Sequence, residues 1–432
     1  MIPEKIYDLI GVGIGPSNLS LAALTDPLEE ISALFFEQKT QFDWHPGMMI
    51  EGTDMQVSFL ADLVTFADPT SNYSYLNYLF KHNRLYHFYF YKHLEIPRKE
   101  YQAYSKWVAE QLEQCLFGKK VIELIDHDDC YEAVIEDTQT HATEHYFARN
   151  IVLGTGSIPI VPDGFESAPS ADIIHSSQYL YYEKELKKSA SITVIGSGQS
   201  AAETFHNLLL EQDIYKYHLT WFTRSSGFMQ LESGKLSEEV FSPEFVDYYH
   251  DLPLSERMKI LPKLHTLRNG ISPETLKSIY DLLYRRSIGG LELKVTIQPL
   301  IELVGYEIEA GSYRLQCRHT QEDITFHYPT EKVVLATGYR PNVPAWINPL
   351  KEKIVWEDEK RFKVTKDYEV VFKKERPHRL FSLTNLEHVA ATGADDLELA
   401  VQRNQRIINK ISGQEHYPVP SHTVFQQFSI QR

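Results

Sequence analysis

The chain has 432 residues, 43% of them hydrophobic and 24% charged, which is ordinary for a globular protein with a substantial core. At roughly 100–200 residues per domain, this length predicts two or three domains. The 43 lysines and arginines against 59 aspartates and glutamates leave a formal net charge of −16, which argues against a nucleic-acid partner and a polybasic membrane anchor.

Cysteine usage and the first residues predict where the protein works. Cys115, Cys130 and Cys317 are scattered and form no CxxC pair, so we expect neither a disulfide framework nor a thiolate zinc site, and we assign no metal. The chain opens on a strand pattern rather than a signal peptide, and no run of about 18 apolar residues predicts a membrane span. We therefore expect a cytoplasmic protein, either a single chain or a homo-oligomer such as a dimer or tetramer.

Short apolar runs that end in glycine-rich turns mark the expected strands. In chain order they are Tyr7–Val12, Asn150–Leu153, Ser191–Ile195 and Lys332–Leu335. Uninterrupted runs of this length are typical of buried parallel strands, and helical patterns follow the first and the third. This arrangement predicts an α/β protein with two Rossmann-like dinucleotide-binding domains.

The first glycine turn predicts a site for an adenine dinucleotide. Its glycines allow a tight turn and a close approach of the backbone to a pyrophosphate at a helix N-terminus. Pro16 stands where the GxGxxG pattern has its third glycine, and Glu37 follows about 20 residues later, where an acid can bond a ribose hydroxyl. The candidate contacts are Gly11, Gly13, Gly15, Pro16, Ser17, Asn18, Glu37 and Gln38.

The second glycine turn predicts a site for a second dinucleotide. Its candidate contacts are Gly196, Gly198, Gln199, Ser200 and Glu203. The strand expected at Leu219–Thr223 ends in Arg224 rather than in an acid. An arginine at this place can hold a 2′-phosphate, so NADPH is favoured over NADH.

Two dinucleotide sites on one chain indicate flavin oxidoreduction, in which one site holds FAD and the other brings NADPH. We expect residues 1–164 and 326–432 to form a discontinuous FAD domain and residues 165–325 the NADPH domain. A charged, aromatic and helix-like stretch at about 228–290 predicts a small helical substrate insert. Residues 395–411 predict an amphipathic helix that ends near Gly413. His45, His93 and His175 stand alone, so the chemistry is expected from the flavin.

Several longer segments resemble the N-hydroxylating flavin monooxygenases of siderophore biosynthesis, which act on ornithine, lysine or diamines. The segments are MQVSFLADL at 55–63, DPTS at 68–71, YLNYL at 75–79, PRKEY at 97–101, HSS at 175–177, FSPEF at 241–245 and ATGY at 336–339. Together with the second glycine turn they follow that family's order along nearly the whole chain. The resemblance implies that NADPH reduces FAD, that O2 adds to it as a C4a-hydroperoxyflavin, and that a neutral primary amine becomes a hydroxylamine.

The same resemblance implies roles for individual residues. The loop from Trp44 to Gly47, which contains His45, and Gln56 should lie along the isoalloxazine ring, with Arg98 near the flavin. The residues expected to face NADPH are His175, Ser176, Gln199, Ser200 and Arg224, with Gly338 and Tyr339 at its approach.

One departure from the family bears on the substrate. Ornithine and lysine hydroxylases carry a lysine at the position of Ala61, where it pairs with the substrate carboxylate, and the ornithine enzymes carry an asparagine at that of Glu238. A methyl group and an acid do not hold a carboxylate, so we expect a decarboxylated amine such as putrescine, cadaverine or histamine, with Glu238 binding a second ammonium. Asn269 is the nearest amide to another substrate-contacting asparagine of the family.

Alternatives stay open at this point. Lys235 or Arg268 could replace the missing lysine, and the chain would then be an L-lysine N6- or L-ornithine N5-monooxygenase. A Baeyer–Villiger-type or disulfide-reducing flavoenzyme is a third interpretation, although the absence of CxxC counts against the latter. A non-catalytic flavin-binding protein is the alternative from a different class, and the intact second glycine turn with Arg224 argues against it.

Overall fold

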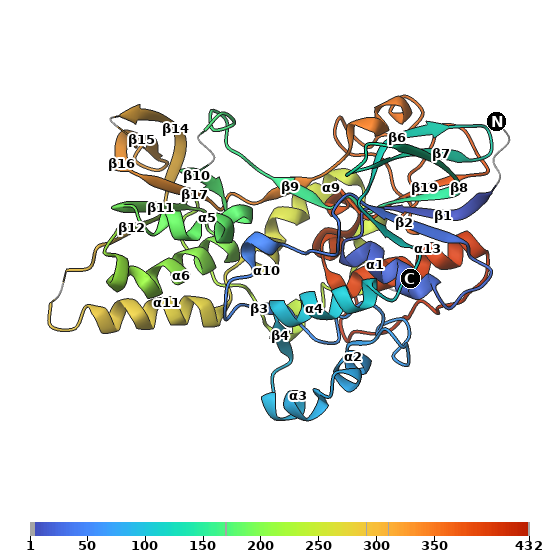
Figure 1. The fold of residues 1–432 in the computed structure, drawn as a ribbon, viewed down its shortest axis with the longest axis horizontal. Helices are drawn as coiled ribbons and strands as arrows, with labels where there is room; N and C mark the ends of the chain where they lie inside the picture. The colour runs from blue at the N-terminus through green and yellow to red at the C-terminus, as the bar shows by residue number, and fades with distance from the viewer. Residues whose placement is uncertain (1–4, 169–170, 291, 310, 431–432) are drawn as a thin grey trace.

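The computed structural model describes residues 5–168, 171–290, 292–309 and 311–430. Two sheets, one mixed and one parallel, lie in the two halves of an elongated molecule (Figure 1). We call the half that contains the N-terminal strand the first half, and the other half the second half. None of the helices described is both long and apolar enough to cross a membrane.

The first half is built on the sheet that carries the first glycine turn. Its parallel strands are, in spatial order, β5 (Cys115–Phe117), β2 (Ala33–Glu37), β1 (Ile6–Val12), β8 (Thr143–Leu153) and β19 (Arg379–Ser382). The start of β8 continues antiparallel into β7 (Tyr131–Asp137) and β6 (Lys119–Asp126). Leu9, Phe35 and Ile151 are fully buried, because both faces of the parallel part are covered.

Helices α1 (Pro16–Thr25) and α13 (Leu397–Ser412) pack together beneath this sheet (Figure 1). The side chain of Asn404 in α13 donates hydrogen bonds to the Ser17 carbonyl oxygen and the Ser20 hydroxyl, at 2.8 and 2.9 Å. Asp396 caps the start of α13, and Gly413, with φ +70°, ends it. The predicted helix at residues 395–411 is therefore confirmed to within two residues.

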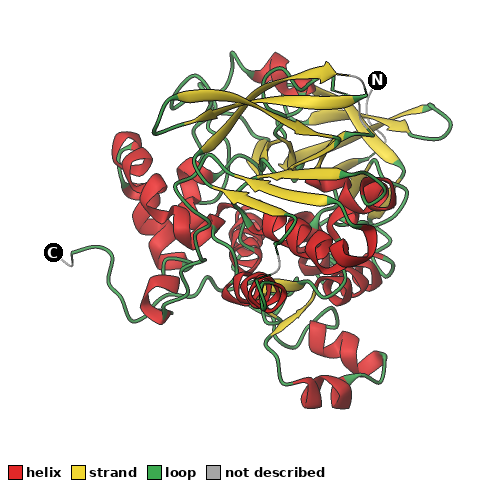
Figure 2. Cartoon of the chain, turned by 90° about the vertical axis from the view of Figure 1, so that its left-hand side faces the viewer, coloured by secondary structure: helices red, strands yellow, loops and turns green. Residues whose placement is uncertain are grey.

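Further helices and short strands complete the first half. Strands β3 (Asp54–Ser58) and β4 (Glu95–Pro97) pair beside α4 (Arg98–Ala109). Between β3 and β4 the chain runs out through α2 (Tyr75–Lys81) and α3 (Leu85–Tyr91). These two helices project away from both sheets, which Figures 1 and 2 show from two directions.

The second half is built on the sheet that carries the second glycine turn. Its strands are all parallel, in the order β10 (Ile173–His175), β17 (Lys332–Leu335), β11 (Ser191–Ile195), β12 (His218–Phe222) and β13 (Val295–Gln298). Helices α5 (Tyr179–Leu186) and α6 (Gln199–Tyr215) belong to this half. An antiparallel sheet of β14 (Ile301–Glu309), β15 (Ser312–His319) and β16 (Ile324–Thr330) packs on it through Leu315 and Cys317.

The stretch between β12 and β13 is helical, as the sequence predicted. Its helices are α7 (Lys235–Glu238), α8 (Pro243–Asp251), α9 (Leu254–Ile260), α10 (His265–Asn269) and α11 (Pro273–Arg286). Helix α11 packs on α6 of the second half, whereas α8 packs on α12 (Glu387–Ala390) of the first half. The insert therefore touches both halves.

The chain crosses between the halves twice. The two crossings, β9 (Ser157–Pro159) and β18 (Tyr339–Pro341), pair as an antiparallel ribbon. The return to the first half was expected at residue 326, which lies inside β16, and this boundary needs correction. Residues 332–335 stay with the second half because they complete its parallel sheet between β10 and β11.

Candidate active site

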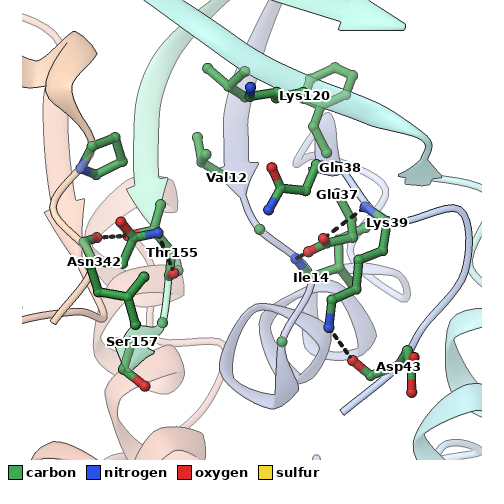
Figure 3. Close-up of a pocket in the computed structure, with 18 of the residues that line it drawn as sticks. Val12, Ile14, Glu37, Gln38, Lys39, Asp43, Lys120, Thr155, Ser157 and Asn342 are labelled. Atoms are coloured by element: carbon green, nitrogen blue, oxygen red, sulfur yellow. Dashed lines mark hydrogen bonds between the residues drawn. The ribbon is translucent and has the colours of Figure 1, made fainter. Parts of the chain in front are cut away.

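A cleft of about 880 Å³ opens at the carboxyl ends of the central strands of the first half. In doubly wound sheets this is where dinucleotides bind. Glu37, Lys39 and Asp43 lie on one side of it, and Thr155, Ser157 and Asn342 lie on the other (Figure 3). Its further lining residues include Gly13, Gly15, Pro16, Gln38, Trp44, His45, Pro46, Lys120, Gly156, Ser177 and Tyr339.

The two glycine turns share a feature that suits a bound phosphate. Helix α1 begins after Gly15 and α6 after Gly198, and no side chain of the described residues caps either start. Helices α2, α8, α11 and α13 are capped by Ser74, Ser242, Ser272 and Asp396. Helices α3, α4, α5 and α9 also begin without a side-chain cap, so what sets α1 and α6 apart is that each follows a glycine turn at the end of a parallel strand. The uncapped N–H groups and the positive end of the helix dipole make both starts natural sites for a pyrophosphate.

The glycines of the first turn differ in what surrounds them. Gly13 has φ +87°, and a Cβ there would lie 2.5 Å from the Gly154 carbonyl oxygen. A Cβ on Gly11 would meet the ring of Phe35 at 2.2 Å. Gly15 has open space where its Cβ would be, on the side of the cleft. Gly11 and Gly13 are thus needed for packing of the protein itself, and Gly15 is the position that leaves room for a ligand.

Glu37 is held at the end of β2 by the backbone. Its carboxylate accepts hydrogen bonds from the N–H groups of Ile14 and Lys39, at 2.9 and 3.0 Å (Figure 3). A carboxylate has about four lone-pair positions, so capacity for ribose hydroxyls is left. The carboxylate lies in the cleft, where the sequence placed it.

Aromatic rings meet where the two halves join. The Tyr339 ring lies 5.1 Å from His175 and 6.0 Å from His45, edge-on to both. The Nδ1 of His175 accepts from the Ser177 N–H at 3.1 Å, so its Nε2 carries the proton and donates to the Gly338 carbonyl oxygen. Burial lowers the pKa of His175. This side chain therefore ties β10 to the crossing as a neutral ring.

The loop from Trp44 to Gly47 lies at the same junction. A Cβ on Gly47 would fall 1.9 Å from the Ser177 carbonyl oxygen, so the two backbones touch. The ring of His45 is open toward the cleft, but protein surrounds its other sides. This burial and the positive charges of Arg98 and Lys39 lower the pKa of His45 to about 4, so His45 is neutral at physiological pH. Gln56 is exposed on β3 and is not among the residues that line the cleft.

Arg98 and Glu203 point at each other rather than at the cleft. Their side chains form two hydrogen bonds, Nη1–Oε2 at 2.7 Å and Nη2–Oε1 at 2.6 Å. Gln199 donates to Glu203 at 2.8 Å and to the Thr275 hydroxyl at 3.0 Å. These three side chains link α4, α6 and α11, so their expected contacts with the cofactors stay predictions.

A smaller cavity of about 300 Å³ adjoins the second glycine turn. It is lined by Ser197, Ser225, Ser226, Gly227, Met229, His265, Thr266, Asn269 and Gly270. Asn269, expected on the substrate, thus lies beside the second glycine turn. Sequence reasoning missed Ser225 and Ser226, although both directly follow Arg224 and hydroxyls are common phosphate ligands. Arg224 itself is exposed, and no carboxylate of the described residues pairs with it.

Comparisons with known proteins support this arrangement. Residues 5–341 match the family model of L-lysine 6-monooxygenase/L-ornithine 5-monooxygenase. The chain is 38% identical to putrescine N-hydroxylase of Shewanella oneidensis, over 99% of this chain and 85% of that protein. The chain belongs to the L-lysine 6-monooxygenase/L-ornithine 5-monooxygenase family. Its expected activity as a flavin- and NADPH-dependent N-monooxygenase is confirmed, as are the cofactors FAD and NADPH.

Solved structures of this N-monooxygenase family have the same fold. The FAD-bound cadaverine monooxygenase of desferrioxamine biosynthesis from Erwinia amylovora superposes with a TM-score of 0.95 at 37% identity, covering 99% of this chain and 100% of that one. An ornithine N-hydroxylase of Kutzneria sp. 744 with reduced FAD, NADP⁺ and L-ornithine has a TM-score of 0.88 at 26% identity, covering 95% of this chain and 99% of that one. The predicted α/β fold with two Rossmann-type halves is confirmed.

Carboxylates from two helices, α7 and α13, gather near Glu238. Glu238 ends α7 with 44% of its side chain exposed, and Lys235 Nζ lies 3.6 Å from it. The negative charge of Glu238 acts on Glu398, which lies in the first turn of α13. Burial, followed by the negative charges of Asp396 and Glu238, raises the pKa of Glu398 to about 8. Sequence reasoning missed Glu398, because an acid in the first turn of a helix is ordinarily a favourable dipole contact.

The two cations that could replace a head-group lysine differ in their surroundings, since Arg268 is ion-paired and Lys235 is exposed. Ala61 is buried with 2% of its surface exposed, and it offers only a methyl group. Arg268 binds the carboxylates of Glu387 and Asp395 at 2.9 and 3.2 Å. The side chain of Lys235 is 94% exposed and points to solvent.

Proposed function

We propose that this chain N-hydroxylates one amino group of an aliphatic diamine that lacks a carboxylate, such as putrescine or cadaverine, for a hydroxamate siderophore. The observation that carries the proposal is the group of acids Glu238, Asp396 and Glu398, in which the negative charges of Asp396 and Glu238 help to raise the pKa of Glu398. Lys235, whose side chain is 94% exposed, lies 3.6 Å from Glu238 at the edge of this group. Burial and the neighbouring negative charges raise the cost of ionising Glu398, and a bound ammonium would lower that cost. A substrate carboxylate would increase it.

The relatives agree with this choice of substrate. The proteins named putrescine N-hydroxylase and cadaverine monooxygenase are 38% and 37% identical to this chain, and the ornithine N-hydroxylase is 26% identical. The first two names describe diamines. Histamine, which the sequence also allowed, has no counterpart among these names.

We also propose how the cofactors divide between the halves. Residues 1–164 and the chain from β18 onward would hold FAD in the 880 Å³ cleft, with its pyrophosphate on the start of α1. Residues 165–338 would hold NADPH, with its pyrophosphate on the start of α6 and its 2′-phosphate near Arg224. FAD, once bound and reduced by NADPH, supplies the activated oxygen, and the protein binds and orients the amine.

The amine must also lose a proton before it can react, because only the neutral form has a free lone pair. A primary amine near the free lysine pKa of about 10.4 is almost entirely protonated at pH 7. Burial disfavours the charged form, and Ala61 contributes an apolar, buried wall to that end. The cluster at Glu238 would hold the other, charged nitrogen. The diamine would thus be bound with one end neutral and one end cationic.

The test compares amines that differ in one group. Hydroxylamine formation is measured with cadaverine, lysine and pentylamine, which share chain length but differ in the carboxylate or the second ammonium. Cadaverine should exceed lysine in kcat/KM by roughly a hundredfold, equivalent to about 2.7 kcal/mol. Glu238→Gln should lower kcat/KM for cadaverine and leave kcat/KM for pentylamine nearly unchanged. Ala61→Lys should lower kcat/KM for cadaverine. If lysine is the better substrate of the wild type, the proposal is wrong and the amino-acid hydroxylase takes its place.

A further inference from the structure

A row of aromatic rings runs from the cleft of the first half to the surface. It starts at Trp44, which lines the cleft, and continues through Tyr101 and Tyr104 of α4 and Tyr78 of α2 to Trp107 near the end of α4. The ring centroids are 5.2, 6.1, 5.8 and 5.6 Å apart in this order. We call these five residues the aromatic row.

The inner rings of the aromatic row are closed off from solvent, and its two ends are not. Tyr101, Tyr104 and Tyr78 are 3%, 0% and 6% exposed, whereas Trp44 and Trp107 are each partly exposed. Tyr101, Tyr104 and Trp107 recur every third residue, so they lie along one side of α4. The aromatic row therefore connects the cleft to the surface through the protein interior.

Every ring of the aromatic row belongs to tyrosine or tryptophan, the aromatic side chains that give up a single electron most readily. Packing alone does not require this choice. The buried hydroxyl of Tyr101 makes no hydrogen bond of normal geometry with the described residues, although Ser105 lies beside it. A phenylalanine would avoid the free-energy cost of such a hydroxyl. In the second half, by comparison, Trp221 packs between the rings of Phe205 and Phe228.

A buried carboxylate lies beside the middle of the aromatic row. Burial, followed by the negative charge of Asp62, raises the pKa of both Tyr101 and Tyr104. Burial also raises the pKa of Asp62 itself, but its carboxylate accepts hydrogen bonds from three backbone N–H groups and the Thr65 hydroxyl, between 2.7 and 2.9 Å, which oppose that shift. The charge that disfavours a tyrosinate favours a positive charge on an oxidised ring, because both effects are Coulombic.

We propose that the aromatic row carries single electrons from the protein surface to the cleft and so protects the residues around the flavin from oxidation. The inference rests on the placement of FAD in this cleft that is proposed above. A flavin monooxygenase handles reduced oxygen at its cofactor. An oxidant that escapes the normal reaction would otherwise attack the nearest side chain, and Trp44 is the first ring in its way.

The electrons and protons of this step balance. The oxidant is an oxygen-centred radical, formed when the O–O bond of a peroxide in the cleft breaks homolytically. It gains one electron from Trp44 and one proton from water. The electron deficit then passes through the three tyrosines to Trp107, which gives its indole proton to the solvent. A thiol in solution returns one electron and one proton to Trp107, so the aromatic row ends unchanged.

Light provides a test that does not depend on turnover. Excitation of the oxidised, FAD-loaded protein without amine turns the flavin into a one-electron oxidant, and transient absorption with electron paramagnetic resonance should detect a long-lived tryptophan radical. Trp107→Phe should lose this signal, and Tyr101→Phe should lose it although only a phenol hydroxyl is removed. The matched control is Tyr131→Phe, because Tyr131 is fully buried with an unpaired hydroxyl among the described residues but lies off the row. It should keep the wild-type signal.

A second measurement follows the damage. Aerobic incubation with NADPH but without amine supplies peroxide at the flavin, and peptide mass spectrometry should then find added oxygen on Trp107 in the wild type. In Tyr101→Phe the added oxygen should move to Trp44. A wild type without a radical or added oxygen at Trp107, a Tyr101→Phe variant that keeps either one, or a Tyr131→Phe control that loses the radical overturns the proposal.

Trp44→Phe separates this proposal from the placement of FAD. A tryptophan beside a flavin quenches its fluorescence, so this variant should fluoresce more strongly than the wild type if FAD lies in the cleft. Equal fluorescence at equal FAD content would show that FAD lies elsewhere, and both proposals would fail. Stronger fluorescence together with a wild type that forms no radical at Trp107 would overturn the aromatic row alone.

Discussion

The guanidinium of Arg98, at the start of α4, donates two hydrogen bonds to the carboxylate of Glu203 in α6, at 2.7 and 2.6 Å. Arg98 belongs to the half with the FAD cleft, and Glu203 sits one turn beyond the second glycine turn. Only 5% of Glu203 is exposed. This pair therefore joins the two cofactor-binding halves through a largely dry contact.

Removing either partner should destabilise the protein strongly. Arg98→Ala leaves the buried carboxylate of Glu203 unpaired, and such losses cost about 3–5 kcal/mol. Arg98→Lys should recover only part of this, because an ammonium cannot make the bidentate contact. The measurement is the urea denaturation midpoint with the free energy derived from it. Arg84→Ala is the control, since Arg84 pairs with Glu100 at 48% exposure and should cost less than about 1 kcal/mol.

Two substitutions in the first glycine turn should distinguish a loss of folding stability from a loss of FAD binding. Gly13→Ala strains a backbone at φ +87° and pushes a Cβ against Gly154, so this variant should unfold at lower temperature even when stripped of FAD. Gly15→Ala has no such clash, because Gly15 has φ −84° and open space beside it. It should fold normally yet lose flavin absorbance near 450 nm. Normal FAD content in Gly15→Ala would show that the pyrophosphate lies elsewhere.

Arg224 should set the preference for NADPH over NADH. Its loss in Arg224→Ala removes charge-assisted hydrogen bonds to the 2′-phosphate, worth about 1.5–3 kcal/mol. The KM for NADPH should rise roughly 10- to 100-fold, while that for NADH should change little. Arg285→Ala, another exposed arginine of the second half, is the control and should change neither value. Equal use of both nucleotides by the wild type would contradict the assignment.

The pKa of Glu398 predicts a stability change with pH. Burial and two neighbouring acids raise this pKa to about 8, above the value of about 4.3 in an unfolded chain. The protonated form stabilises the fold fully below pH 4, and this contribution is lost as the pH rises to 8. Glu398→Gln should therefore gain stability relative to the wild type at pH 8 to 9 and gain less at pH 5. Thermal unfolding across this range measures it, and a pH-independent difference would argue against the shifted pKa.

The C-terminal residues should hold the helix that presents Glu238. The N–H groups of Phe425 and Gln426 donate to the Glu239 carboxylate at 3.1 and 2.9 Å, and Thr423 binds Glu244. Deleting residues 422–432 should raise the KM for the diamine several-fold with a smaller change in kcat. Glu239→Gln should act in the same direction but more weakly. An unchanged KM in the deletion would show that the tail does not position α7.

The sequence alone predicted the repeated elements of the fold. Apolar runs ending in glycine turns located β1, β11 and β17, and Gly413 marked the end of α13, because a buried parallel strand and a left-handed helix end each need specific residue types. Cofactor identity followed from the two glycine turns, and the family from segments spread along the chain. These signals are local, so they can be read without knowing what lies opposite them.

Contacts between distant segments were decided by the tertiary structure. Arg98 and Glu203 are 105 residues apart, and their mutual pairing could not be read from either motif. Lys332–Leu335 joined the second sheet because it pairs in parallel with both β10 and β11, which moved the expected domain boundary. The charge of Glu238 acts on Glu398 because folding brings the start of α13 near the end of α7, although the two residues lie far apart in the sequence. Burial and charge act through space, and sequence spacing does not encode that distance.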